Sequence, residues 1–583
     1  MPDKKRHLIT TADERTWKFD CPVIFLGEWC QLYNRRHIWG KMDFIVAEPF
    51  GLDHMQRDRD DKICREVEDE LVIVATDILN KFHGVAHSYR YWRIIFGQWL
   101  RAYVELIFNR YKTLQFCLEK YIIGSTICIN DESFNLATAD TKSFYLASND
   151  DVWNNVLYSK LLLFFDSESI DKTTVENGSS YFTKAPSSLK SSFIKNTLYS
   201  FLKIFAKESD AIIASTYLPY WEEIKLKLAL KQVPIRYDHP ALCFSRPNLM
   251  LRREISNTLL TDDKTGYFKC VRNMLFEMMP TCFLEDYKMM SAVVEKLDWP
   301  SKPRFIFTSN NYFYDEVFKF VAAEKVEMGI PYYVGQHGSF GTDKTNYPTV
   351  EMLTCDKYLK WGSATTIEQE VPAFVLKLAN KKSIVPNKSG GLLFVQNLQG
   401  HRTEIWDNTH RYILSMARNF SFYNDLDEKI KRSAIIRLHS AKDIFRQYEY
   451  ERWRDADKEI KIDGNSDLNT LLGNSRITVF SYNSAGLLEN LCQNIPTLVL
   501  VDDIYFIGDV ARPHYNYLAD VEIVHFSSTS AAKKVNTVWD NIDTWWMSSE
   551  IQNARKLFCE KFARQSESPI SDIIKIFSSK TGS

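Results

Sequence analysis

Hydrophobic and polar positions in the C-terminal third of the chain alternate between short apolar runs and stretches with helical spacing. The apolar runs are rich in β-branched residues and predict strands, and the stretches between them predict helices. Continuous apolar strands separated by helices are typical of a parallel sheet that is covered on both faces, so we predict a doubly wound domain. The predicted strands begin at Gly391, Ala434, Glu459, Arg476, Pro496 and Val521.

The N-terminal part shows similar strands at wider spacing, with long helical patterns between them. It therefore predicts a second α/β domain that carries a helical insertion. A stretch at 380–391 contains the Pro, Gly and Ser residues that are typical of a linker between domains. The predicted strands begin at Pro22, Ala211, Arg304 and Pro331, and the helical patterns cover 60–81 and 91–121.

A chain of 583 residues is too long for one hydrophobic core. We predict an α/β fold of two Rossmann-like domains that face each other across a cleft. The N-terminal domain, with its helical insertion, covers 1–385, and the C-terminal domain covers 386–545. We expect a helical segment at 546–583 to pack back on the N-terminal domain.

The net charge and the spacing of the cysteines indicate which partners the protein can attract and in which compartment it works. With 73 basic and 74 acidic residues the net charge is −1, so no global field attracts nucleic acid. The 11 cysteines are scattered without a CxxC pair, which indicates a reducing compartment and no zinc site. No apolar run approaches the roughly 18 residues of a membrane span. We expect a cytoplasmic protein, with peripheral contact at the inner face of the cytoplasmic membrane left open.

Three turns that follow predicted strands would converge on one edge of the C-terminal sheet. They cover 437–440, 462–467 and 481–484. In the first turn, Arg437 can hold phosphate oxygens in a planar fork, and His439 can donate a further hydrogen bond. Each residue alone has an equally good structural explanation. Arg437 can form an ion pair at the surface, and His439 can be a turn histidine whose hydrogen bonds are made by its neighbours.

The third turn combines small polar residues with the start of a helical pattern. Ser481, Asn483 and Ser484 can offer hydroxyl groups, an amide and a helix N-terminus to a phosphate. Glu489, about a turn and a half into the helix, can accept a hydrogen bond from a ribose hydroxyl. Helix capping by the serines and a solvated glutamate are the structural alternatives. No GxGxxG or GxxxxGK[ST] motif follows a strand, which excludes the usual dehydrogenase and P-loop fingerprints.

Two predicted strand ends in the N-terminal part carry further candidates. Gln336, His337 and Gly338 directly follow one strand. Glu28 follows another, next to Gly27, whose missing side chain allows close backbone approach. A carboxylate at the carboxyl end of a strand that faces a cleft is a candidate general base.

A third group of candidates has helical spacing. His83, His87, Arg90 and Arg93 are separated by three or four residues. The pair of histidines lacks the HExxH pattern of a zinc helix, and Gly84 lies between them. We predict that these four residues bind the acceptor or an anion, and we identify no metal site.

Five segments together resemble a family of sugar transferases encoded in bacterial O-antigen and other surface-polysaccharide gene clusters. The QHG turn and the strand, SxNS, helix arrangement are more distantly similar to capsule Kdo transferases and CDP-glycerol glycerophosphotransferases. The resemblance spans nearly the whole chain and is weakest in the helical middle. The segments are "PVIFLGEWCQLYNRRHIW", "HGVAHSYRYWRII", "YYVGQHGSFG", "FSYNSAGLLENLCQNIPTLVL" and "AAKKVNTVWDNIDTWW".

The resemblance implies a GT-B architecture and an inverting, metal-independent glycosyl transfer without a cofactor. It implies that a nucleotide-activated sugar, linked to CMP, UDP or GDP, binds the C-terminal domain. A glycan or lipid-linked glycan acceptor would bind the N-terminal domain, where Glu28 is similar in placement to the catalytic carboxylate of lipid A Kdo transferases. We expect Glu28 and His337 to be catalytic. The residues expected to bind the donor are Arg437, His439, Ser481, Asn483, Ser484, Glu489, Gln336 and Gly338.

Two other functions fit the same sequence features. A sugar-nucleotide 2-epimerase shares the two-domain cleft but needs a paired acid and base within it. A non-catalytic scaffold protein of the assembly complex would bind nucleotide without turnover. The presence of Glu28, His337 and Arg437 favours the transferase over the scaffold.

Overall fold

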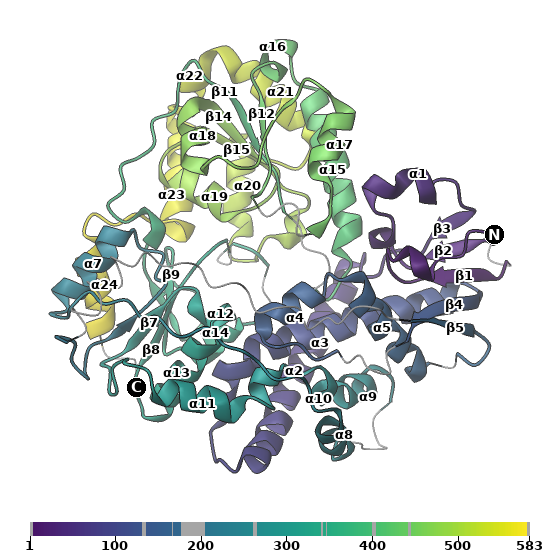
Figure 1. Ribbon diagram of the computed structural model, residues 1–583. Coiled ribbons are helices and arrows are strands. Elements are labelled where there is room, and N and C mark those ends of the chain that lie inside the picture. Colours follow the sequence, from purple (N-terminus) through teal and green to yellow (C-terminus); the bar gives the residue numbers. More distant parts are fainter. Residues whose placement is uncertain are drawn as a thin grey trace.

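The computed structural model describes residues 4–130, 136–165, 167–176, 204–259, 265–339, 342–344, 347–398, 404–440 and 445–579. Within these ranges the chain forms an α/β fold in which every pairing between named strands is parallel. Figure 1 shows the C-terminal sheet and its helices above the two sheets of the N-terminal part. The predicted class of fold is therefore confirmed.

The C-terminal sheet has six strands, and its order reverses between β11 and β14. In chain order this is the 3-2-1-4-5-6 arrangement of a doubly wound sheet, as the alternating strands and helices predicted. Ligands bind such sheets at the carboxyl edge, at the point of reversal. The strands, in spatial order, are β13 (Lys461–Asp463), β12 (Ile435–Arg437), β11 (Gly391–Val395), β14 (Ser475–Phe480), β15 (Thr497–Leu500) and β16 (Val524–His525).

The N-terminal part contains two five-stranded sheets, where the sequence predicted one Rossmann-like domain. Strand periodicity shows which residues are extended, but the partner of each strand depends on tertiary contacts. The first sheet consists of β3 (Phe44–Val46), β2 (Val23–Phe25), β1 (Arg6–Ile9), β4 (Ile123–Ile129) and β5 (Asp171–Val175). The second consists of β10 (Glu370–Pro372), β9 (Lys357–Lys360), β8 (Tyr332–Gly335), β7 (Ile306–Thr308) and β6 (Ile212–Ile213).

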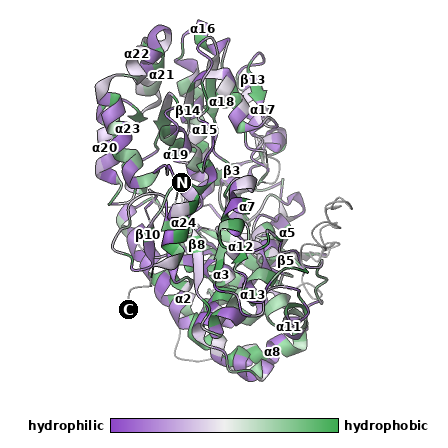
Figure 2. Cartoon of the chain, turned by 90° about the vertical axis from the view of Figure 1, so that its left-hand side faces the viewer, coloured by the Kyte–Doolittle hydropathy of each residue, from purple (hydrophilic) through white to green (hydrophobic). Residues whose placement is uncertain are grey.

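Two long helices form the predicted helical insertion. Asp53 caps α2 (His54–His83) by accepting from two backbone N–H groups, and Gly84, at φ +70°, ends it. Ser88 then caps α3 (Tyr89–Lys120), which is buried along most of its length. The buried apolar side chains of α3 join the main core, and Figure 2 shows the hydropathy of the chain along this helix and its neighbours.

The remaining helices cover the sheets or connect them. They include α5 (Asp151–Leu161), α7 (Tyr220–Ala229), α12 (Asn311–Tyr314), α13 (Glu316–Glu327), α15 (Asn408–Asn424), α17 (Glu449–Ala456), α19 (Ala485–Cys492), α20 (Arg512–Asp520), α23 (Ser549–Phe562) and α24 (Pro569–Ser578). The short 3₁₀ helices are η2 (Glu28–Cys30), η3 (Tyr33–Arg35) and η6 (Leu376–Leu378).

The C-terminal segment crosses from one part of the molecule to the other. Helix α23 packs on α19 and α20 of the C-terminal sheet. Helix α24 then returns to the second N-terminal sheet, where the Phe577 ring packs against Phe305, Phe307 and Tyr333. None of the described helices combines the length and apolar composition needed to cross a bilayer.

Candidate functional site

Both N-terminal sheets contact the C-terminal sheet at its carboxyl edge. From the first sheet, Glu28 reaches His410 at the start of α15. From the second, Asp343 in the segment after β8 reaches Asn483 in the turn after β14. We call this contact region the junction. It includes the point of strand reversal at which doubly wound sheets bind ligands.

Glu28 is held at the end of β2 by local packing. It begins η2, and the ring of Trp29 lies so close to Gly27 that a Cβ there would be only 2.0 Å from a ring carbon. The Trp29 indole N–H donates to the Thr10 carbonyl at 2.9 Å. Glycine is therefore required directly before Glu28, as close approach at this strand end predicted.

The partner of Glu28 comes from the C-terminal domain. Asp407 caps α15, and His410 occupies its first turn. His410 Nδ1 lies 3.1 Å from each carboxylate oxygen of Glu28. The hydrogen bond to Glu28 raises the pKa of His410 above its ordinary value, the charges of Glu28 and Asp407 add to this effect, and burial opposes it.

A cavity of about 30 Å³ lies beside Glu28, with room for one or two water molecules. A second pocket, of about 380 Å³, shares Leu32, Asp151 and Arg446 with its lining. The smaller cavity is bounded by the first sheet on one side and by α15 and the segment before α17 on the other. The small cavity next to the Glu28 carboxylate therefore adjoins a pocket that has room for a larger polar group.

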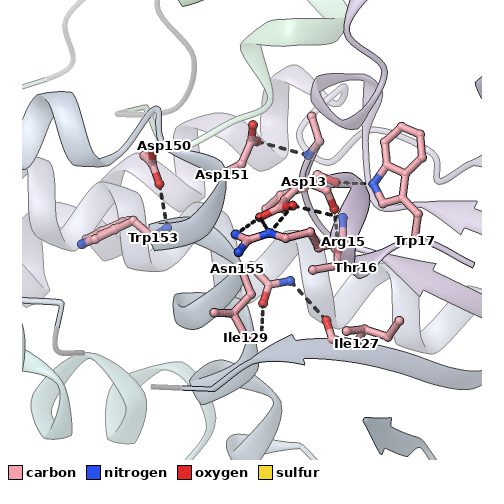
Figure 3. Close-up of polar contacts among 12 residues, drawn as sticks. Asp13, Arg15, Thr16, Trp17, Ile127, Ile129, Asp150, Asp151, Trp153 and Asn155 are labelled. Atoms are coloured by element: carbon pink, nitrogen blue, oxygen red, sulfur yellow. Dashed lines mark hydrogen bonds and ion pairs between the residues drawn. The ribbon is translucent and has the colours of Figure 1, made fainter. Parts of the chain in front are cut away.

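Carboxylates and guanidinium groups line the larger pocket. Asp151 accepts from the backbone N–H of Ala12 at 3.1 Å and pairs with Arg446 at 2.6 Å. Asp150 caps α5, and its pKa is raised by burial. Figure 3 shows Asp151 directed toward the turn that contains Asp13, whereas Asp150 is directed toward the backbone N–H of Trp153 in its own helix. The described polar groups here hold the edge of the first sheet together and present oxygen atoms to the pocket.

The small polar residues after β14 have structural roles. Ser481 accepts from the backbone N–H of Asn397, which ties the ends of β14 and β11 together at 3.1 Å. Ser484 caps α19 by accepting from the N–H of Leu487. Asn483 donates to Asp343 at 2.6 Å, so it contributes to the junction. The structural explanation by capping is thus correct for Ser484, and all three residues lie at the predicted edge.

Arg437 and His439 lie at the neighbouring strand end, as predicted. Arg437 is the last residue of β12, and its buried Nε has no hydrogen-bond partner among the residues that the structure describes. Burial lowers the pKa of His439, and the nearby charge of Arg437 lowers it further. A guanidinium with unused donor capacity at this edge suits an anionic ligand.

The carboxylate of Glu489 already has a partner and is not available as an acceptor for a ligand at this edge. Its carboxylate is buried and pairs with Lys377 of η6 at 2.9 Å. This ion pair joins α19 to the segment that leads out of the second N-terminal sheet. The predicted ribose contact of Glu489 thus gains no support from the geometry.

The QHG turn lies at the carboxyl edge of the second sheet. Gln336 is buried; its side chain donates to the Gly338 carbonyl and accepts from the Trp361 N–H, and Gly338 adopts φ +77°. His337 Nδ1 lies 2.9 Å from the Tyr312 hydroxyl, and burial lowers the pKa of His337. Gln336 and Gly338 therefore shape the turn, and His337 belongs to a separate polar group from Glu28.

The four residues predicted to bind the acceptor lie away from Glu28. The 30 residues of α2 span about 45 Å, and its first residue, His54, stacks on Tyr505 at the junction. His83 ends the helix, contacts the Phe283 carbonyl and has its pKa lowered by burial to about 4. His87 stacks on Tyr91, Arg90 binds Asp356, and Arg93 binds Asp69. The geometry gives these side chains structural partners and no place in the junction.

A sequence model of the LIC12162 family transferases matches residues 6–577. The chain belongs to this family of transferases. It is therefore an enzyme that moves a chemical group from a donor to an acceptor. No curated protein matches this transferase.

Solved structures show only partial similarity to the LIC12162 family transferase. Spinosyn rhamnosyltransferase SpnG with spinosyn aglycone is 11% identical, covering 63% of this chain and 100% of its own, with a TM-score of 0.33. MurG of Acinetobacter baumannii is 10% identical, covering 63% and 99%, with a TM-score of 0.30. A Listeria monocytogenes protein described as a UDP-N-acetylglucosamine 2-epimerase is 13% identical, covering 60% and 94%, with a TM-score of 0.32.

Several charged residues of this transferase were not identified from the sequence. Besides His410, they are Arg411 and Arg418 of α15, which both pair with Asp502 after β15. The Arg411 guanidinium also lies 3.5 Å from the centre of the Phe506 ring. The helical spacing of apolar residues predicted this helix, but it did not show which face of the helix lies at the edge of the sheet. The capping residue Asp407, three positions before His410, was the available signal for its first turn.

Proposed function

We propose that this transferase moves a sugar from a nucleotide-activated donor to a hydroxyl group of a glycan or lipid-linked glycan acceptor. One observation carries the proposal. The Glu28 carboxylate forms a hydrogen bond with His410 across the junction, opposite the carboxyl edge of a doubly wound sheet. A basic group and a phosphate-binding edge in one junction are what such a transfer needs. The acceptor we favour is a growing surface polysaccharide, such as O-antigen or capsule.

The donor nucleotide is proposed to bind at the ends of β12 and β14, in a GT-B arrangement of domains. Arg437 has a buried N–H group there that no described residue accepts, and His439 lies two residues on. The backbone N–H groups at the start of α19 can interact with a phosphate of CMP, UDP or GDP. These positively charged and N–H groups would stabilise the negative charge that develops on the leaving phosphate.

The proposed reaction is an inverting displacement. The acceptor oxygen forms a bond to the anomeric carbon while the bond from that carbon to the phosphate oxygen breaks. The proton of the acceptor hydroxyl passes to the basic group that depends on Glu28, and the nucleotide leaves with the electron pair. Apposition of the two domains would exclude the water that otherwise hydrolyses the donor.

The proposed compartment is the cytoplasm, with the inner face of the cytoplasmic membrane as the place of contact with a lipid-linked acceptor. None of the 11 cysteines, all of which the structure describes, forms a disulfide, which agrees with a reducing compartment. Membrane contact would be peripheral.

A nucleotide panel followed by product analysis tests the function. Thermal unfolding is measured with CMP, UDP and GDP, and the matching sugar nucleotides are then incubated with and without a glycan acceptor. We expect one nucleotide to raise Tm and its sugar to be transferred only when acceptor is present. An epimerised sugar without acceptor would support the 2-epimerase, and binding without any product would support the scaffold.

A further inference from the structure

Glu28 and His410 come from different domains and meet through one hydrogen-bonded pair. Nδ1 of the imidazole lies 3.1 Å from both oxygens of the carboxylate. When Nδ1 carries the proton and donates it to Glu28, the other ring nitrogen, Nε2, has a free lone pair. Nε2 makes no hydrogen bond within the described part of the chain, so it can accept a proton.

An imidazole is ordinarily a stronger base than a carboxylate. The ordinary pKa of histidine, about 6.5, lies above that of glutamate, about 4.3. The hydrogen bond to Glu28 raises the pKa of His410 above its ordinary value. A base with a pKa near the working pH is also more efficient than a weaker one.

We propose that Nε2 of His410 accepts the proton of the acceptor hydroxyl, and that Glu28 holds the ring and stabilises the imidazolium ion. The inference rests on the proposed glycosyl transfer and assigns its proton acceptor. The O–H bond of the acceptor breaks, an N–H bond forms on Nε2, and the freed electron pair of the oxygen attacks the anomeric carbon. Glu28 is then a positioning residue, and His410 is the catalytic residue.

The location of the pair fits this role. The side chains of His410 and Glu28 are 26% and 22% exposed, so both are reachable without being fully solvated. The water-sized cavity next to Glu28 adjoins the pocket of about 380 Å³. Since His410 belongs to the domain proposed to hold the donor, the pair is complete only when the two domains are apposed. Proton transfer would therefore depend on closure.

The rival explanation is an ion pair that only joins the domains. A matched control is available, because Arg36 pairs with Asp455 of α17 at 2.6 Å and joins the same two parts of the molecule. Arg36→Gln breaks that contact without altering the proposed base. If the Glu28 pair were only structural, its variants should resemble Arg36→Gln.

The kinetic test compares His410→Gln, Glu28→Gln, the double variant and Arg36→Gln. We expect each single variant of the pair to lower kcat by about 10²- to 10⁴-fold. The double variant should be little worse than His410→Gln, because the two residues act as one unit. Arg36→Gln should keep kcat within about twofold. Near-normal kcat in His410→Gln would overturn the proposal.

The pH dependence of kcat/KM separates an imidazole base from a carboxylate base. The charged groups that act on the ring in the described structure are Glu28 and Asp407. Activity should rise with pH through a limb above about 6.5 in the wild type. In Glu28→Gln the limb should move to lower pH, because the group that raises the pKa of His410 is gone. A limb in the range of an ordinary carboxyl group in the wild type would contradict the assignment.

Calorimetric measurement of nucleotide binding distinguishes a failure of the proposed glycosyl transfer from a failure of the proton-acceptor assignment. Unchanged nucleotide affinity in His410→Gln, together with lost transfer, supports the assignment. A wild-type protein that binds no nucleotide would refute the proposed function itself, whereas binding and transfer that survive His410→Gln would refute only the proton acceptor.

Discussion

Single side chains at the junction differ in how much hydrogen-bonding capacity their neighbours already use. Ser484 caps a helix, Asn483 bridges two segments, and Glu489 is paired with Lys377. Arg437 differs, because its buried Nε has no partner among the described residues. A buried donor without a partner is costly unless a ligand satisfies it. This contrast makes Arg437 the most informative residue for locating the donor.

Arg437→Ala should weaken binding of the donor nucleotide by about 1.5–3 kcal/mol, or roughly 10- to 150-fold in Kd, through loss of a charge-assisted hydrogen bond. Isothermal calorimetry measures the change. The control is Arg432→Ala, which removes an exposed guanidinium from the same domain. Ser484→Ala should instead lower stability by about 1 kcal/mol as a lost helix cap. Equal affinity in Arg437→Ala and wild type would place the nucleotide elsewhere.

The segments between elements decide how the two halves meet. The segment after β8 contacts the turn after β14 through Asp343, which accepts from Asn483 and from Ser339. Burial raises the pKa of Asp343 to about 6, although these two hydrogen bonds lower it. The contact between the two segments is therefore expected to change with pH.

Asp343→Asn should change how stability depends on pH. The folded-state pKa of about 6 lies above the ordinary value of about 3.9, so the folded protein retains a proton that the unfolded chain loses. Wild-type stability should therefore fall as pH rises from about 4 to about 6. The variant cannot ionise and should lack this fall, so its Tm relative to wild type should increase with pH.

Thermal melts between pH 4 and 8 check this expectation. The control is Asp509→Asn, which removes a carboxylate whose side chain is 79% exposed in the wild type. Curves for Asp343→Asn and wild type that run parallel would show that Asp343 does not titrate in this window.

The whole molecule brings three sheets together around one junction, and α24 returns to the second sheet after the C-terminal domain is complete. Phosphate charge at this junction would be met by Arg437, His439 and the start of α19. No group of three or more His, Cys, Asp or Glu side chains is arranged for a metal in the part of the chain that the structure describes.

Transfer activity should survive EDTA, because protein groups are proposed to stabilise the leaving phosphate. The measurement compares initial rates with and without chelator, and again after adding Mg²⁺ or Mn²⁺. Rates within about twofold of each other are expected. Loss of activity in EDTA that either metal restores would contradict the metal-independent mechanism.

The sequence determined the local structure of much of this protein. The alternating apolar runs and helical patterns identified the C-terminal strands, and the spacing of apolar residues identified α2 and α3, because side-chain period follows directly from backbone geometry. It also placed Glu28 and Arg437 at strand ends. The LIC12162 family match is itself a property of the sequence.

Only the tertiary structure decided which strands share a sheet and which side chains meet. The separation of β2 from β6, β7 and β8 into two sheets depends on packing between residues far apart in the chain. His410 lies 382 positions from Glu28, and no local pattern encodes that contact. His83 and His87 had a helical spacing suited to binding, but α2 ends at His83, which is buried and contacts the Phe283 carbonyl, while His87 lies beyond the helix and stacks on Tyr91. Spacing fixes the face on which a side chain lies, whereas the contacts of that face depend on how the whole chain folds.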